Sequence, residues 1–209
     1  MGTRHLTAVF LDGEYKIAQY GQWDGYPEGQ GIDTLTFLRN EMNMETFKAA
    51  LRNSSYISDE ELAALWKVYA PDSVDGMVTL QQADAMKHDH PEFSRDTGAG
   101  ILKIVQSHPD GIQLHNQLDF AADSLFCEWA WVIDLDAGTF EAYEGFNHEP
   151  LTPDDRFYFL RDKERKNEDK DITGDSYYGV RLVAKWDLTS LPTDEDFLAA
   201  FKTEENEDE

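Results

Sequence analysis

Apolar and polar residues alternate near the start of the chain, as they do in a β-strand with one buried face. Residues 4–11 have this pattern, and the pair Asp12-Gly13 follows them directly. Such a pair is a typical two-residue hairpin turn, and residues 14–20 then return as a second strand. The pattern predicts a β-hairpin whose two open ends lie at the same edge.

Helical spacing replaces the alternation after the hairpin. Ser58, with Glu61 three residues later, forms a capping-box sequence that predicts the start of a helix, and Pro71 ends that helix. Thr79 can cap the next one. Five helices are predicted from the spacing of apolar residues, over residues 33–39, 44–51, 58–70, 79–86 and 98–106.

The period changes back to two at about Ser124. One long strand is predicted from there, with every second residue on one face: Leu125, Cys127, Trp129, Trp131, Ile133 and Leu135. Residues 136–138 form a turn, and residues 139–143 form the partner strand. Residues 157–160 and 177–187 have the pattern of a further antiparallel pair, and Thr193 begins a final helix.

This order of elements predicts an α+β fold. Antiparallel sheets are built from hairpins, and several helices are inserted after the first hairpin, without the alternation of strand and helix that marks a parallel sheet. We expect one domain over residues 1–203, followed by a disordered acidic tail over residues 204–209. Residues 161–176 contain almost nothing apolar, so a solvated excursion is expected there.

The charge of the chain is strongly negative. Its 42 acidic and 18 basic residues give a formal net charge of −24, and residues 105–155 contain no Lys or Arg. This balance argues against direct binding of nucleic acid and favours a basic protein as partner. The candidate interaction face consists of carboxylates from this stretch: Asp110, Asp119, Asp123, Glu141, Glu144 and Glu149. Solubility is the alternative explanation of the same charge.

Other classes of protein find little support in the sequence. The apolar runs are too short to cross a bilayer and no secretory signal is visible, so we expect a cytoplasmic protein that does not bind membranes. The single cysteine, Cys127, excludes a disulfide framework. His88 and His90 could supply two metal ligands, but no third follows at a fixed spacing, and Asp75-Gly76 lacks the flanking carboxylates of a calcium loop. We predict no metal and no cofactor.

The loop over residues 20–31 is rich in glycine and aromatic residues, and such loops often bind ligands. Together with the start of the first strand it supplies the candidate ligand-binding residues: Arg4, His5, Tyr20, Gln22, Trp23, Asp24 and Tyr26. Two structural alternatives stay open. Trp23 and Tyr26 could pin the loop to the core, and Arg4 could pair with Asp24 to close the hairpin.

Three segments resemble an uncharacterised family of small proteins from phages and assorted microbes. They are GTRHLTAVFLDGEYKIAQYGQWDGYPEGQG, FCEWAWVIDLDAGTFEAYEGFN and YYGVRLVAKWDL, which cover about half of the chain. The resemblance implies no activity. The topology is also loosely similar to that of the N-terminal-nucleophile hydrolases, in which the first residue attacks an amide, and only Thr3 could take that role here.

Two hypotheses about function follow. The first is a non-catalytic acidic interaction protein, a phage-type accessory or counter-defence factor that engages a basic protein surface. The alternative is a small-molecule or nucleotide-binding protein, or a hydrolase, with its site at the open end of the first hairpin. No catalytic motif is present, which favours the first hypothesis.

Overall fold

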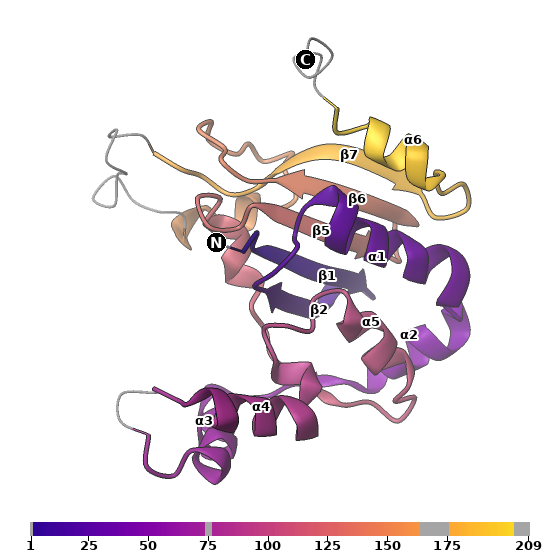
Figure 1. Ribbon diagram of the computed structural model, residues 1–209. Coiled ribbons are helices and arrows are strands. Elements are labelled where there is room, and N and C mark those ends of the chain that lie inside the picture. Colours follow the sequence, from indigo (N-terminus) through magenta and orange to yellow (C-terminus); the bar gives the residue numbers. More distant parts are fainter. Residues whose placement is uncertain (1, 74–76, 164–175, 203–209) are drawn as a thin grey trace.

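The computed structural model describes residues 2–73, 77–163 and 176–202, and its centre is a five-stranded sheet. Figure 1 shows the strands in the order β2-β1-β5-β6-β7. Their bounds are β1 His5–Leu11, β2 Glu14–Gly21, β5 Trp129–Asp134, β6 Thr139–Glu144 and β7 Arg181–Asp187. The sheet is mostly antiparallel and carries helices, so the predicted α+β class is confirmed.

One parallel pairing joins the two halves of the sheet. β1 and β2 form the predicted first hairpin, and β5 and β6 form a second one. β1 also pairs in parallel with β5, with His5 opposite Trp129 and Phe10 opposite Asp134. The long connection between the hairpins contains most of the helices, which is how a parallel neighbour can be reached.

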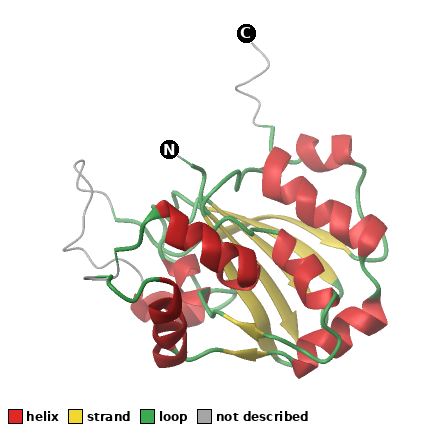
Figure 2. Ribbon diagram, turned by 60° about the horizontal axis from the view of Figure 1, so that its bottom comes forward, coloured by secondary structure: helices red, strands yellow, loops and turns green. Residues whose placement is uncertain are grey.

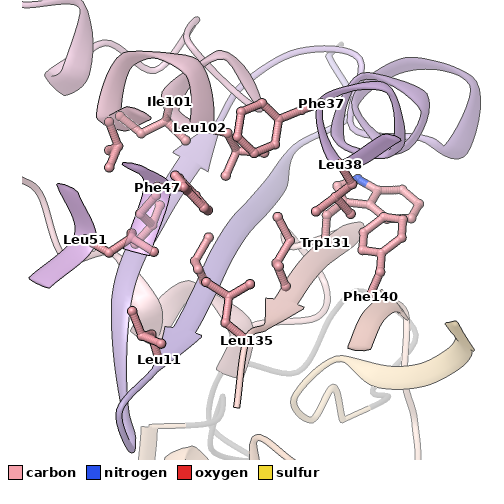
Figure 3. Packing of buried hydrophobic residues seen from close by; sticks show 14 of the residues in the cluster. Leu11, Phe37, Leu38, Phe47, Leu51, Ile101, Leu102, Trp131, Leu135 and Phe140 are labelled. Atoms are coloured by element: carbon pink, nitrogen blue, oxygen red, sulfur yellow. The ribbon is translucent and has the colours of Figure 1, made fainter. Parts of the chain in front are cut away.

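Helices cover one face of the sheet, as Figures 1 and 2 show. The chain is helical through Pro27–Gly31, α1 Ile32–Thr36 and Phe37–Glu41, and it continues with α2 Met44–Asn53, α5 Gly100–Gln106 and, near the C-terminus, α6 Asp194–Ala199. Their buried side chains meet those of the strands in the larger core cluster, part of which Figure 3 shows. Trp131 of β5 and Phe140 of β6 are fully buried there, against Phe197 of α6.

A second apolar cluster lies on the opposite face. Leu6, Ala130 and Tyr143 from the strands pack there with Phe157. The covering segments are two 3₁₀ helices, Leu118–Ala122 and Tyr158–Lys163. The predicted strand over residues 157–160 is therefore wrong. Phe157 and Leu160 are both buried while Phe159 between them is exposed, and this spacing of three fits a 3₁₀ turn better than a strand. β7, which was expected to pair with residues 157–160, pairs with β6.

The strand predicted from Ser124 begins later than expected. Residues 124–128 fold into turns, in which the backbone N–H groups of Phe126 and Cys127 both donate to the carbonyl of Asp123. β5 starts at Trp129. Cys127 therefore packs in the second cluster, whereas Trp129 and Trp131 face the first. The expectation that Cys127 shares their face was wrong because the turns break the alternation.

A pair of helices projects away from the sheet in Figure 1. They are α3 Asp59–Tyr69 and α4 Leu80–Asp89, and a short parallel pair, β3 Ser55–Tyr56 and β4 Gln113–Leu114, lies at their base. Ser58 caps α3 in the predicted box with Glu61. Thr79 caps α4 in a second box with Gln82. Both helices begin where the sequence predicts.

Several expectations concern residues outside this description. Asp75-Gly76, most of the excursion over residues 161–176 and the tail over residues 204–209 lie outside the described residues, although residues 161–163 belong to the second 3₁₀ helix. Within the described parts of the chain, no helix is long and apolar enough to span a membrane.

Candidate functional site

The loop at the open end of the first hairpin is tied down by its backbone. The N–H of Gln22 donates to the carbonyl of Arg95 at 2.9 Å, and the N–H of Gly25 donates to the carbonyl of Thr3 at 2.9 Å. The buried indole N–H of Trp131 donates to the carbonyl of Gly25, also at 2.9 Å. From Pro27 onward the predicted loop is helical. The loop is therefore pinned by its backbone and not, as the alternative supposed, by Trp23 and Tyr26, whose side chains are exposed.

His5 is sealed inside the protein. Its imidazole packs directly on Gly21, where a side chain would have no room. Neither ring nitrogen has a hydrogen-bond partner among the described residues. Burial lowers the pKa of His5 to about 3, and the backbone of Thr3 only partly opposes this shift. A neutral, enclosed imidazole of this kind is a core residue, because a ligand could not reach it.

The other predicted ligand-binding residues pair among themselves or with nearby groups. The Trp23 indole, 47% exposed, donates to Asp96, and the hydroxyls of Tyr20 and Tyr26 donate to Gln22 and Asp24. Arg4 lies 3.8 Å from the carboxylate of Glu128 and stacks over the ring of Phe126. The suggested closing pair of Arg4 with Asp24 is therefore not the contact that forms. The best-formed cavities of the described residues are lined by other side chains.

One of these cavities lies at the turn end of the same hairpin. It encloses about 510 Å³, with Phe10 and Tyr15 of the hairpin on one side and Arg156 and Phe159 on another. Glu141 of β6 forms part of its wall and is almost completely buried. The prediction that Glu141 belongs to an exposed interaction face is wrong. Its side chain points to the sheet face opposite that of its neighbours Phe140 and Ala142, where Arg156 covers it.

Glu141 is the centre of a buried network of charges. Arg156 Nε donates to it at 2.8 Å, Lys185 Nζ lies 3.1 Å away, and the Tyr143 hydroxyl donates at 2.7 Å. Arg156 also binds Asp134 of β5. Burial alone would raise the pKa of Glu141, but the hydrogen bonds from Arg156 and Tyr143 lower it to about 2.

The network fits a structural role. A carboxylate that already accepts several hydrogen bonds and holds its proton so weakly is a poor general base at neutral pH. The two acids, Asp134 and Glu141, balance the two bases, Arg156 and Lys185, so the buried charges are compensated. Arg156 thereby ties the segment before the second 3₁₀ helix to β5 and β6.

The remaining members of the predicted interaction face lie in several places. Asp110 is in the loop after α5, and Asp119 pairs with Lys163 at the second apolar cluster. Glu144 is the last residue of β6, Glu149 lies in the segment after it, and Asp123 precedes the turn over residues 124–126 to which that segment is hydrogen-bonded. The stretch over residues 105–155, which contains no Lys or Arg, therefore forms no single face. Three of its carboxylates, those of Asp123, Glu144 and Glu149, belong to one small region.

Phe146 lies within that region and is 50% exposed. Its φ angle is +52°, which places a bulky residue in the left-handed region of backbone conformation. Its N–H donates to the carbonyl of Ser124 at 2.7 Å, and the next N–H, of Asn147, donates to the Ser124 hydroxyl at 3.1 Å. The buried amide of Asn147 donates to the carbonyl of Gly179 at 2.9 Å. The strained conformation is thus held by its surroundings. Sequence reasoning missed Phe146, because a single aromatic residue in a turn carries no pattern.

The histidine pair does not form a metal site of its own. His88 is exposed and lies 3.9 Å from Asp89, whereas His90 turns toward Glu92, 3.1 Å away, and contacts the ring of Phe93. Among the described residues, no group of three or more His, Cys, Asp or Glu side chains is placed to hold a metal ion.

Comparisons with known proteins identify no relative of this chain. No protein family, curated protein or solved structure matches this chain. The resemblance to phage and microbial proteins, and the looser likeness to the N-terminal-nucleophile hydrolases, stay predictions.

The charge network predicts a pH dependence of stability. The folded pKa of Glu141, about 2, lies below its ordinary value of 4.5, so its contribution is present above pH 4.5 and is lost as the pH falls toward 2. Glu141→Gln should therefore lower the free energy of unfolding most at neutral pH, on the order of 3 kcal/mol, and the gap to the parent should close at acid pH. Urea unfolding of the parent and of the variant between pH 7 and pH 2 measures the size of this difference and its dependence on pH.

Glu149→Gln, at an exposed carboxylate, is the control and should change stability by less than about 1 kcal/mol at any pH. A gap for Glu141→Gln that stays constant across the pH range would contradict the role given to this network.

Proposed function

We propose that this protein is a non-catalytic acidic interaction protein that engages a basic surface of a partner protein. The contact region is the Phe146 surface, defined here as Asp123, Glu144, Phe146 and Glu149. The exposed ring of Phe146, in the segment that follows Glu144 and is hydrogen-bonded to the residue after Asp123, is the observation that carries the proposal.

The backbone of this surface supports the proposal. A non-glycine residue with positive φ costs free energy, and such residues tend to persist at functional sites when their surroundings hold them in place. The hydrogen bonds from Phe146 and Asn147 to Ser124 do this here. They keep the aromatic ring half outside the protein, although a glycine at this position would relieve the strain.

The charge of the chain supports it as well. A formal charge of −24 attracts a basic partner over long range and accelerates encounter, while a desolvated aromatic anchor supplies affinity. Arg181 pairs with Glu149 at the rim of the surface. The finer role, a phage-type accessory or counter-defence factor, rests on the family resemblance alone.

The small-molecule alternative has one observation in its favour. The cavity of about 510 Å³ has the size of a ligand pocket and an aromatic wall, but it lies at the turn end of the hairpin instead of the open end. Thermal-shift screening against nucleotides and metabolites tests it. A stabilising ligand whose effect disappears in Phe159→Ala supports the cavity, whereas loss in Trp23→Ala supports the open end.

The proposed interaction predicts that the Phe146→Ala variant binds a basic partner protein much more weakly than the parent does. The immobilised parent protein should retain a basic protein from a host extract, and the amount retained should fall as salt rises from 50 to 500 mM because salt screens the attraction. Phe146→Ala should retain at most about one tenth as much at equal salt, as expected for an anchor residue. Phe159→Ala removes an equally exposed ring elsewhere and should behave like the parent. Retention that ignores salt, or equal retention by both variants, would refute the proposal.

The positive φ of Phe146 predicts an inverted order of stability between two variants. At an ordinary position glycine is less stable than alanine, but in the left-handed region glycine avoids a strain of about 1 kcal/mol. Phe146→Gly should therefore unfold at a higher urea concentration than Phe146→Ala. The opposite order would mean that this residue does not hold the strained conformation in solution.

A further inference from the structure

A groove runs along one side of the projecting helix α3. It has a volume of about 610 Å³, and the apolar residues that line it, here called its floor, are Ile57, Ala64, Leu65, Val68, Phe93 and Ile112. The polar residues of its wall are Glu61, His90, Glu92 and Gln113. We refer to this groove, defined by these ten residues, as the α3 groove.

The apolar side chains of α3 are poorly covered. None of its residues, all of which the structure describes, is buried, and Val68 is 73% exposed. Most of the packing of α3 is against α4, since the sheet lies elsewhere in Figure 1. A helix whose stability comes from burying an apolar face normally covers that face better than this. The groove thus offers an unpartnered apolar surface.

The charged side chains that line the groove are carboxylates, and Lys67 in the last turn of α3 is not among the lining residues. Glu61 and Glu92 belong to its wall, and Asp59 and Glu60 extend the negative charge along the first turn of α3. None of the described Lys or Arg side chains lines the groove. His90 lies beside Glu92, with its Nδ1 3.1 Å from the carboxylate. An occupant with apolar residues toward the floor and positive charges toward the rim matches both properties.

A second copy of this chain does not match them. Each copy carries a formal charge of −24, so self-association through an acidic rim brings like charges together. The fitting partner is a basic amphipathic helix. Its apolar residues, spaced by three and four, would lie on Leu65, Val68 and Ile112, and its Lys or Arg residues would approach Glu61 and Glu92.

We propose that the α3 groove binds a basic amphipathic helix of a partner protein. The α3 residues that line the groove run from Glu61 to Val68, about 11 Å along the helix axis, which is enough for two turns of a bound helix. The groove shares no residue with the Phe146 surface, so this proposal does not rest on the one above.

The probe is a synthetic 15-residue peptide of Leu and Lys with its leucines spaced by three and four. A peptide of the same composition in scrambled order, which has no apolar face, is its control. Fluorescence anisotropy at 150 mM salt measures the affinity of each peptide for the full chain. The patterned peptide should bind at least about tenfold more tightly than the scrambled one, because only it can fill the apolar floor.

Two lysine variants at neighbouring positions of α3 locate the binding. Ala64 lines the groove, whereas its exposed neighbour Ala63 does not. Both substitutions add the same charge, but only Ala64→Lys places it on the apolar floor. Ala64→Lys should weaken the binding of the patterned peptide by about tenfold or more, and Ala63→Lys should weaken it by about twofold at most. Phe146→Ala should bind the peptide like the parent.

Three results would overturn the proposal. Equal binding of both peptides would show attraction by charge alone, and equal effects of the two lysine variants would place the peptide elsewhere. A dimer in sedimentation at 150 mM salt that dissociates in Ala64→Lys would show that a second copy occupies the groove. If Ala64→Lys fails to fold, Val68→Lys takes its place, since Val68 is largely exposed.

Discussion

The indole of Trp131 is the contact on which the rest of this structure depends. Its N–H donates to Gly25 in the loop after the first hairpin, and its ring lies so close to Gly31 that an added Cβ there would be 2.8 Å from it. The same ring packs against Phe140 of β6 and Phe197 of α6. One buried side chain of β5 thus positions the loop, the first helical segment and the last helix on the sheet. This is why the glycine-rich loop, although rich in ligand-binding residue types, is held against the core.

On the opposite face of the sheet, buried ion pairs contribute to the packing in addition to apolar and aromatic side chains. Arg156 joins Asp134 and Glu141 there, and a buried ion pair of this kind is costly unless both signs are balanced. Because the charges of this network balance one another, the network does not account for the excess of carboxylates in the chain. Carboxylates near exposed apolar groups, at Phe146 and along α3, are the places where the proposed basic partners would gain both attraction and burial.

Much of the fold could be predicted because its signals are local. The turn at Asp12-Gly13 and the capping boxes at Ser58 and Thr79 depend on residues within a few positions of each other, and all three form as expected. The parallel pairing of β1 with β5 could not be predicted, since nothing near His5 indicates that Trp129 lies opposite. The late start of β5 has a similar cause, because turns at residues 124–128 interrupt an alternation that looks continuous in the sequence.

The candidate sites were harder to predict than the fold. A run of carboxylates without bases says nothing about which side of a strand each residue faces, and Glu141 is buried only because Arg156 reaches it from a distant segment. His5 is enclosed for a comparable reason, under Gly21 and the loop that Trp131 holds. In both cases a tertiary contact converts a residue type typical of function into part of the core.

The central claim is that partners bind at exposed aromatic and acidic surfaces and not at the loop of the first hairpin. Hydrogen–deuterium exchange of the full chain, alone and with the basic protein that it retains, tests this most directly. The account predicts slower exchange at residues 123–128 and 144–149 in the complex, with residues 20–26 unchanged. Protection confined to residues 20–26 would contradict it and would return the function to the open end of the hairpin.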